Sequence, residues 1–191
     1  MKSKEKISVI TLGCPKNIVD SERFITLLDK SKYEVNFTYD QPDILIINTC
    51  GFIKSARDEN QSIIEEAIDL KSKGAIKQLY VAGCYSQRYD EFLSARYPQV
   101  DKFFGVDFQK DLLHELNSDK YELQGERFLL TPKHYAYSKI SDGCDRSCSF
   151  CAIPQIKGKH HSSPIEKLTS EARNLALQGV KELILIGQDT T

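Results

Sequence analysis

The sequence predicts an α/β protein: a Rossmann-like three-layer domain with a parallel sheet, followed by the first β-α-β unit of a β/α barrel. Two observations lead to this prediction. Apolar runs typical of buried parallel strands alternate with amphipathic helical stretches over residues 7–117. A second β-α-β pattern follows a polar stretch. We therefore predict a domain over 1–118, a connector over 119–133 and a second domain over 134–191.

The composition is that of an ordinary globular protein, with 191 residues, 40% of them hydrophobic and 28% charged. The net charge of −1 gives no support for a broad nucleic-acid-binding face. The apolar run at 7–12 is too short for the core of a secretory signal, and no stretch is long enough for a membrane span. We expect a cytoplasmic protein with reduced cysteines and no membrane partner.

In the first domain, the run at 7–12 predicts a strand that ends at Gly13-Cys14. Asp20 or Ser21 is expected to cap the next helix; Asp20 and Glu22 also form a possible carboxylate pair, but we prefer the cap. A short strand is expected at 33–38. The nearly continuous apolar run at 43–48 is typical of a strand buried on both faces.

The domain continues with an amphipathic helix that Ser55 is expected to cap and that ends near Gly74. The alternation then predicts four more elements: a strand at 77–82, a helix at 87–96, a strand at 101–106 and a helix at 109–117.

In the second domain, a strand at 134–140 leads directly into a cysteine-rich loop. Ser163-Pro164 opens a helix over 164–178, Gly179 ends it, and a strand follows at 181–186. Because two strands cannot close a barrel, we expect the chain to be part of a longer protein.

Three of the six cysteines, Cys14, Cys50 and Cys84, each directly follow a predicted parallel strand. The carboxyl ends of parallel strands gather at one edge of a sheet, where ligands usually bind. The pattern therefore predicts one shared site with three thiolates. The alternative is that each is a small buried apolar side chain, as free cysteine often is.

The other three, Cys144, Cys148 and Cys151, have the spacing C-x3-C-x2-C on one loop. Three thiolates suit an iron–sulfur cluster or zinc. A four-iron cluster held by three cysteines leaves one iron open to a small molecule. The alternative is a zinc site completed by His160 or His161.

These motifs together resemble the methylthiotransferases, a family of radical S-adenosylmethionine (SAM) enzymes. The matching stretches are 12–22 (LGCPKNIVDSE), 48–50 (NTC), 82–88 (AGCYSQR), and the cysteine loop with 152–154 (AIP). The resemblance implies two [4Fe–4S] clusters, an auxiliary one and one that binds SAM. Their implied ligands are Cys14, Cys50 and Cys84 for the first, and Cys144, Cys148 and Cys151 for the second.

The resemblance also implies the chemistry. One electron, from a donor such as flavodoxin or ferredoxin, cleaves SAM to a 5′-deoxyadenosyl radical that takes hydrogen from an unactivated carbon. The auxiliary cluster would supply sulfur, and a second SAM the methyl group. Phe150 is expected to pack beside SAM or simply to anchor its loop. Gly187 and Gln188, at the end of the second barrel strand, are expected to bind the SAM amino group.

Residues Pro15-Lys16-Asn17 indicate the branch of the family. They resemble the branch that modifies the β-carbon of an aspartate in a small-subunit ribosomal protein, the partner we expect. The tRNA-modifying branch usually has Gln-Met-Asn there, so a modified adenosine beside the anticodon is the alternative substrate. A non-catalytic zinc or iron–sulfur module is a second alternative.

One segment departs from the family. Where relatives have a glycine flanked by arginines and then Arg-Ser-Arg-Pro, this chain has Lys157 to Pro164 (KGKHHSSP). The arginine fork with its bidentate geometry is missing. A role of this loop in binding the carboxylates of SAM or substrate, and a role as a solvated turn, both stay open.

Overall fold

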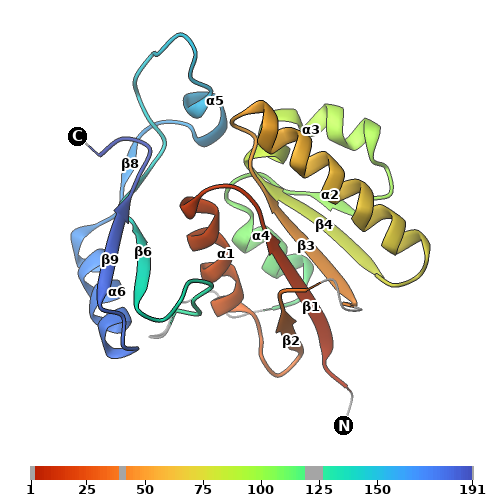
Figure 1. Cartoon of the computed structure of the whole chain (residues 1–191), viewed down its shortest axis with the longest axis horizontal. Coiled ribbons are helices and arrows are strands. Elements are labelled where there is room, and N and C mark those ends of the chain that lie inside the picture. Colours follow the sequence, from red (N-terminus) through yellow and green to blue (C-terminus); the bar gives the residue numbers. More distant parts are fainter. Residues whose placement is uncertain (1–2, 39–41, 119–126, 191) are drawn as a thin grey trace. The chain divides into compact units, whose positions relative to one another are not determined.

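The structure, a computed structural model, describes residues 3–38, 42–118 and 127–190. The chain divides into two compact units, which we describe separately (Figure 1). The first unit comprises Met1–Gly13 and Leu28–Lys120, and the second Cys14–Leu27 and Tyr121–Thr191. The predicted domain limits at 118 and 133 stay a prediction, since the connector residues 119–126 lie outside the described residues.

The first unit is built on a five-stranded sheet in the order β2-β1-β3-β4-β5, with every neighbouring pair parallel. This confirms the predicted Rossmann-like sheet. The order reverses between β1 and β3, so the topological switch point of the sheet lies there. The strands are β1 (Glu5–Thr11), β2 (Tyr33–Asn36), β3 (Ile44–Thr49), β4 (Gln78–Gly83) and β5 (Lys102–Phe103).

Strand β3 lies at the centre of this sheet, and all six of its residues are buried. Its apolar side chains fit both faces, as a strand covered by helices on either side requires. Helices α2 (Lys54–Ser72) and α3 (Cys84–Arg96) pack on one face (Figure 1). The core there includes Leu45, Ile47, Ile64, Ala67, Leu79, Val81, Tyr85 and Leu93. Helix α4 (Phe108–Glu115) completes the unit, and the Tyr33 hydroxyl donates to the carbonyl of Leu116 at 2.5 Å.

The second unit contains helix α1 (Pro15–Leu27) and a parallel pair of strands, β6 (Tyr135–Lys139) and β9 (Glu182–Ile186). Helix α6 (Ile165–Leu177) connects these strands, which gives the predicted β-α-β unit. Its small core contains Ala136, Leu175 and Val180. The sequence did not predict three short elements between β6 and α6: β7 (Ser141–Asp142), α5 (Ile153–Lys157) and β8 (His161–Ser162).

Both predicted helix caps are wrong. Helix α1 begins at Pro15, because proline suits the first helical position, so Asp20 and Ser21 are buried in its middle. Helix α2 begins at Lys54, with Ile53 in extended conformation at the cap position, so Ser55 is already inside the helix. Helix α3 also begins earlier than predicted, at Cys84.

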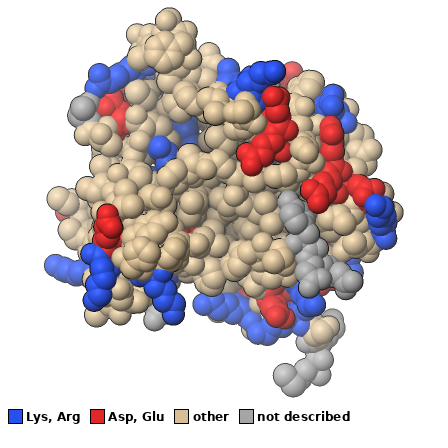
Figure 2. Space-filling model, viewed as in Figure 1, with Lys and Arg blue, Asp and Glu red and all other residues tan. Residues whose placement is uncertain are grey.

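The surface agrees with the near-neutral composition. In Figure 2, lysine and arginine side chains are interspersed with aspartate and glutamate on the face shown. In the described part of the chain, no helix has both the length and the apolar character needed to cross a membrane.

Candidate functional site

The carboxyl ends of β1, β3 and β4 lie at one edge of the sheet in the first unit, beside the switch point between β1 and β3. Cys50 directly follows β3, and Cys84 directly follows β4. Gly13, two residues after β1, has a φ of +89°, and a Cβ atom there would overlap the Cys50 side chain. A Cβ at Gly51 would lie 2.8 Å from the Cys84 carbonyl oxygen. Glycine therefore permits close packing of the segments that carry these cysteines.

Helix α2 fixes the backbone of Cys50 through Asn60. The Asn60 side chain is fully buried, donates to the Cys50 carbonyl at 2.5 Å, and accepts from the Cys50 N–H at 3.4 Å. Asn60 was not among the residues predicted from the sequence. The available signal was a polar residue in line with buried Ile64 and Ala67, at helical spacing four and seven residues on.

Cys14 is the first residue of the second unit and lies at the start of α1. Its carbonyl accepts hydrogen bonds from the N–H groups of Asn17, at 3.0 Å, and Ile18, at 3.3 Å. Its Sγ lies 3.9 Å from Asn17 Oδ1. The structure thus holds the Cys14 backbone in the first turn of a helix.

The loop with Cys144, Cys148 and Cys151 extends from a small hairpin. Strands β7 and β8 pair antiparallel at its base, and the Cys144 N–H donates to the Gly158 carbonyl at 3.2 Å. Gly143 has a φ of +72°, and a Cβ there would overlap the Lys159 carbonyl. A turn joins the last two cysteines, with the Cys151 N–H donating to the Cys148 carbonyl at 3.1 Å.

The three thiols of this loop differ in exposure: Cys144 is buried, Cys151 is partly buried and Cys148 is exposed. All six cysteines of the chain are outside disulfides. Among the described residues, no three or more His, Cys, Asp or Glu side chains form a group that could hold a metal ion as they stand. The donor chemistry, three thiols on one loop closed at its base, nevertheless fits a thiolate-held cluster.

The end of β9 lies against the Cys144 loop. Arg146 Nε donates to Asp189 Oδ2 at 2.6 Å, and this hydrogen bond and charge raise the pKa of the arginine. Asp189 Oδ2 lies 3.9 Å from Cys144 Sγ, and its carbonyl accepts from the Ser141 hydroxyl at 2.9 Å. The loop is therefore tied to the segment that contains Gly187 and Gln188.

Two predicted SAM contacts differ in their surroundings. The Oε1 atom of Gln188 is buried and accepts no hydrogen bond from the described residues. Such an acceptor suits a positively charged N–H donor, such as an α-ammonium group. Phe150 has 88% of its surface exposed, so it does not anchor the loop against the described chain.

A largely buried cluster of four charges, which we call the quartet, adjoins this loop. It consists of Asp20, Lys139, Asp142 and Lys157. Lys139 Nζ lies 2.5 Å from Asp20 and 2.6 Å from Asp142, and Lys157 Nζ lies 3.5 Å and 3.8 Å from the same carboxylates. Burial disfavours ionised Asp142, but the two lysine charges outweigh it and lower its pKa.

A second ion cluster also includes a residue of helix α1, Glu22. Arg127 Nε is 3.2 Å from Glu22 Oε2, and Arg127 NH1 donates to Glu171 at 2.8 Å. Burial raises the pKa of Glu22, and Arg127 partly opposes this. Asp20 and Glu22 thus lie in the middle of α1, and each forms an ion pair with a cation from elsewhere in the second unit. This structural role is neither the carboxylate pair nor the helix cap considered from the sequence.

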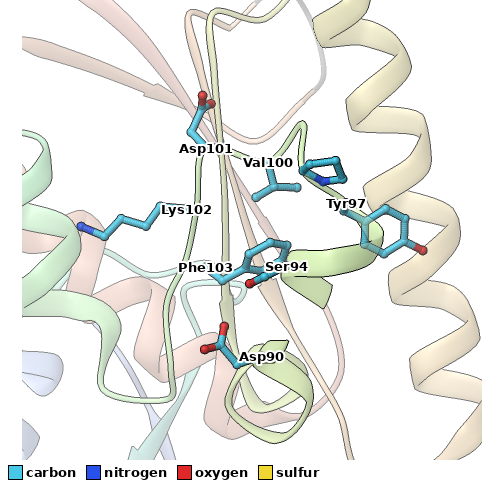
Figure 3. A pocket seen from close by; sticks show the side chains of 8 residues that line it. Asp90, Ser94, Tyr97, Val100, Asp101, Lys102 and Phe103 are labelled. Atoms are coloured by element: carbon cyan, nitrogen blue, oxygen red, sulfur yellow. The ribbon is translucent and has the colours of Figure 1, made fainter. Parts of the chain in front are cut away.

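A pocket of about 400 Å³ lies elsewhere in the first unit, beside α3 and β5 (Figure 3). Its lining includes Tyr97, Val100, Asp101 and Phe103. Asp101 Oδ2 already accepts from Lys71 Nζ at 2.5 Å and from the Leu79 N–H at 2.7 Å. The pocket contains no cysteine and none of the predicted site residues, so we do not assign it a role.

The fold and the cysteines define an α/β protein with two thiols at the carboxyl ends of neighbouring parallel strands in the first unit, and three thiols on one loop after the first strand of a β-α-β unit in the second. The chain belongs to the family described as Uncharacterized protein family UPF0004, which matches residues 6–105, more than half of its length. This confirms the family resemblance predicted from the motifs.

Curated relatives agree with this assignment. The chain is 49% identical to "Ribosomal protein uS12 methylthiotransferase RimO" of Cytophaga hutchinsonii and 51% identical to the protein of the same name of Flavobacterium johnsoniae. Each match covers 98% of this chain and 44% of the relative. The chain therefore spans less than half the length of these relatives.

One solved structure has a similar fold, with a TM-score of 0.62 over 97% of this chain and 48% of the other. It is TsrM of Kitasatospora setae, a radical S-adenosylmethionine methyltransferase, bound to tryptophan and a SAM analogue. At 12% identity, this likeness supports the fold alone.

Proposed function

We propose that this chain is part of a radical SAM methylthiotransferase that modifies the β-carbon of an aspartate in a small-subunit ribosomal protein, in the cytoplasm. The observation that carries the proposal is the match over 98% of the chain to proteins named for methylthiolation of uS12, together with all six cysteines at the strand ends and loop that the chemistry needs. Ribosomal protein uS12 is the substrate those names give.

Six cysteines of the chain would hold the two clusters. Cys14, Cys50 and Cys84 would ligate the auxiliary [4Fe–4S] cluster, and Cys144, Cys148 and Cys151 the cluster that binds SAM. When bound, the clusters and SAM supply the electron, the radical, the sulfur and the methyl group, chemistry beyond the reach of side chains. A flavodoxin or ferredoxin is the proposed electron donor.

The rest of the site would position these groups. Asn60 holds the Cys50 backbone, and Gly13 keeps the end of β1 close to it. Gln188 would offer its buried Oε1 to the SAM ammonium group. Phe150, which is exposed, is available to cover bound SAM.

The test is anaerobic turnover on the ribosomal protein. Because this chain spans 44% of its relatives' length, the assay uses both the chain and a longer protein that contains it. With SAM, a reductant and uS12, we expect 5′-deoxyadenosine and an aspartate in uS12 that has gained one methylthio group in place of a hydrogen. A Cys148→Ala variant is the control and should form neither product.

Two results would overturn the proposal. Methylthiolation of tRNA with none of uS12 would place the protein in the tRNA-modifying branch. Purification with zinc and no capacity to take up iron and sulfide would leave a structural metal protein instead of an enzyme.

A further inference from the structure

The quartet connects the chain segments that carry two different sets of cysteines. Asp20 lies on α1, six residues after Cys14. Asp142 lies two residues before Cys144. Lys157 lies at the end of α5, directly before Gly158, whose carbonyl receives the Cys144 N–H. The quartet thus touches the helix that begins after Cys14 and both ends of the Cys144 loop, all within the second unit.

We propose that the quartet is a positioning device that holds Cys14 at a fixed distance from the Cys144 loop. The inference rests on the proposed function, in which these cysteines hold two clusters that must act on one substrate. Asp20, Lys139, Asp142 and Lys157 are therefore positioning residues for the reaction.

The geometry of the quartet is closed. Each lysine contacts both carboxylates, so the two positive and two negative charges form a ring with no net charge. Moving α1 along its axis by one residue, about 1.5 Å, would lengthen both contacts of Asp20. The ring therefore favours one position of α1 against β6, β7 and α5.

Stability alone does not account for such a ring. Removing charges from water costs free energy that their mutual attraction often fails to recover, so apolar side chains would hold this helix at least as well. Here three of the four side chains have 10% or less of their surface exposed. Buried charges specify one arrangement instead, because any shifted packing leaves a charge without a partner.

The ring also bears on the loop that departs from the family pattern. The side chain of Lys157 has 4% of its surface exposed and its Nζ lies within 4 Å of two carboxylates. Its positive charge is balanced inside the protein. In this chain Lys157 therefore positions the cysteine loop.

Helix α1 offers a matched control in Glu22. Its side chain is as buried as that of Asp20 and also pairs with a cation, but Arg127 connects it to Glu171 and to the Tyr137 carbonyl, not to the cysteine loop. Asp20→Asn and Glu22→Gln each remove one buried negative charge from the same helix. Only the first breaks the quartet.

The first measurement is hydrogen–deuterium exchange of the metal-free chain. In Asp20→Asn we expect the hydrogen-bonded amides of Asn17, Ile18, Cys144 and Cys151 to exchange about tenfold faster than in the wild type. In Glu22→Gln the amides of Cys144 and Cys151 should keep the wild-type rate. Equal acceleration of the loop in both variants, or none in Asp20→Asn, would overturn the inference.

A second variant separates positioning from charge balance. Asp20→Asn with Lys157→Gln restores neutrality, so we expect its midpoint of urea unfolding to recover towards the wild type while its loop exchange stays fast. Recovery of both the urea midpoint and the slow loop exchange would show that the quartet only balances charge, and this would overturn the proposal. If Asp20→Asn alone fails to fold, this double variant gives the same test.

The third measurement uses the chain reconstituted with iron and sulfide. After reduction, magnetic interaction between two clusters broadens their electron paramagnetic resonance signals. We expect Asp20→Asn to change this broadening at unchanged iron content, and Glu22→Gln to leave it unchanged; an unchanged signal in Asp20→Asn would count against the inference. If the wild type takes up no iron, the proposed function fails, while the exchange experiment still decides whether the quartet couples the two segments.

Discussion

At the scale of single residues, Gly13 lies tightly against the Cys50 side chain in the first unit. Gly13→Ala would force a Cβ into the Cys50 side chain at a φ of +89°. We expect it to lower the free energy of unfolding by roughly 3 kcal/mol or more, the sum of backbone strain and overlap. Gly74→Ala is the control, because Gly74 has a φ of +74° with open space around it. Its cost should be about 1 kcal/mol. Urea unfolding of both variants measures the difference, and equal costs would refute the close approach.

A second residue gives a pH-dependent prediction. The Asp43 carboxylate accepts a hydrogen bond from the Lys6 backbone N–H at 2.8 Å, and it lies 2.6 Å from Lys77 Nζ. Both contacts lower the pKa of the Asp43 carboxyl. The resulting stabilisation is present above the ordinary aspartate pKa and is lost as the pH falls through the lowered folded pKa. We expect Asp43→Asn to cost about 1 kcal/mol at pH 7.

The test compares unfolding free energies across pH. The difference between the wild type and Asp43→Asn should shrink as the pH falls below about 4. Asp58→Asn, which breaks an exposed pair at 3.9 Å, should have little effect at any pH. A difference for Asp43→Asn that does not change with pH would contradict the assigned ionisation.

At the scale of elements, the β7–β8 hairpin controls the shape of the Cys144 loop. A Cβ at Gly143 would overlap the Lys159 carbonyl, whereas Gly158, with nearly the same φ, has open space. We expect Gly143→Ala to lose the SAM-binding cluster, about half of the iron of the reconstituted chain, and Gly158→Ala to retain it. Iron analysis of the two variants tests this. Equal iron content would show that the hairpin is not needed for the cluster.

Elements of strong periodicity could be predicted from the sequence. The apolar run of β3 and the amphipathic pattern of α2 gave both elements to within about two residues. The two-residue strands of the β7–β8 hairpin could not, because such short strands show no periodicity. The caps of α1 and α2 were misplaced because polar residues near a helix start resemble caps, and only the packing shows that Asp20 is buried in an ion cluster.

At the scale of the whole molecule, the six thiols separate into sets that can be tested independently. Cys50 and Cys84 follow neighbouring strands of the first unit, while Cys148 and Cys151 lie on one loop of the second. The position of Cys50 and Cys84 at one edge of the sheet could be predicted, since parallel strands end at one edge. That Cys14 opens a helix of the second unit could not, because ion pairs distant in sequence determine where α1 packs.

The two sets predict distinct losses. Replacing Cys50 and Cys84 with alanine should remove the auxiliary cluster and leave about four irons per chain with the SAM-induced spectral change intact. Replacing Cys148 and Cys151 should also leave about four irons, but without any response to SAM. If either double variant lost all iron, the two sets would not be independent sites.

The most direct test of the account is the iron content of the wild-type chain after anaerobic reconstitution with iron and sulfide, with spectra recorded before and after addition of SAM. We expect about eight irons per chain, as two four-iron clusters require, and a change of the electron paramagnetic resonance signal when SAM is added. Bound zinc with no iron, or iron whose signal ignores SAM, would contradict it.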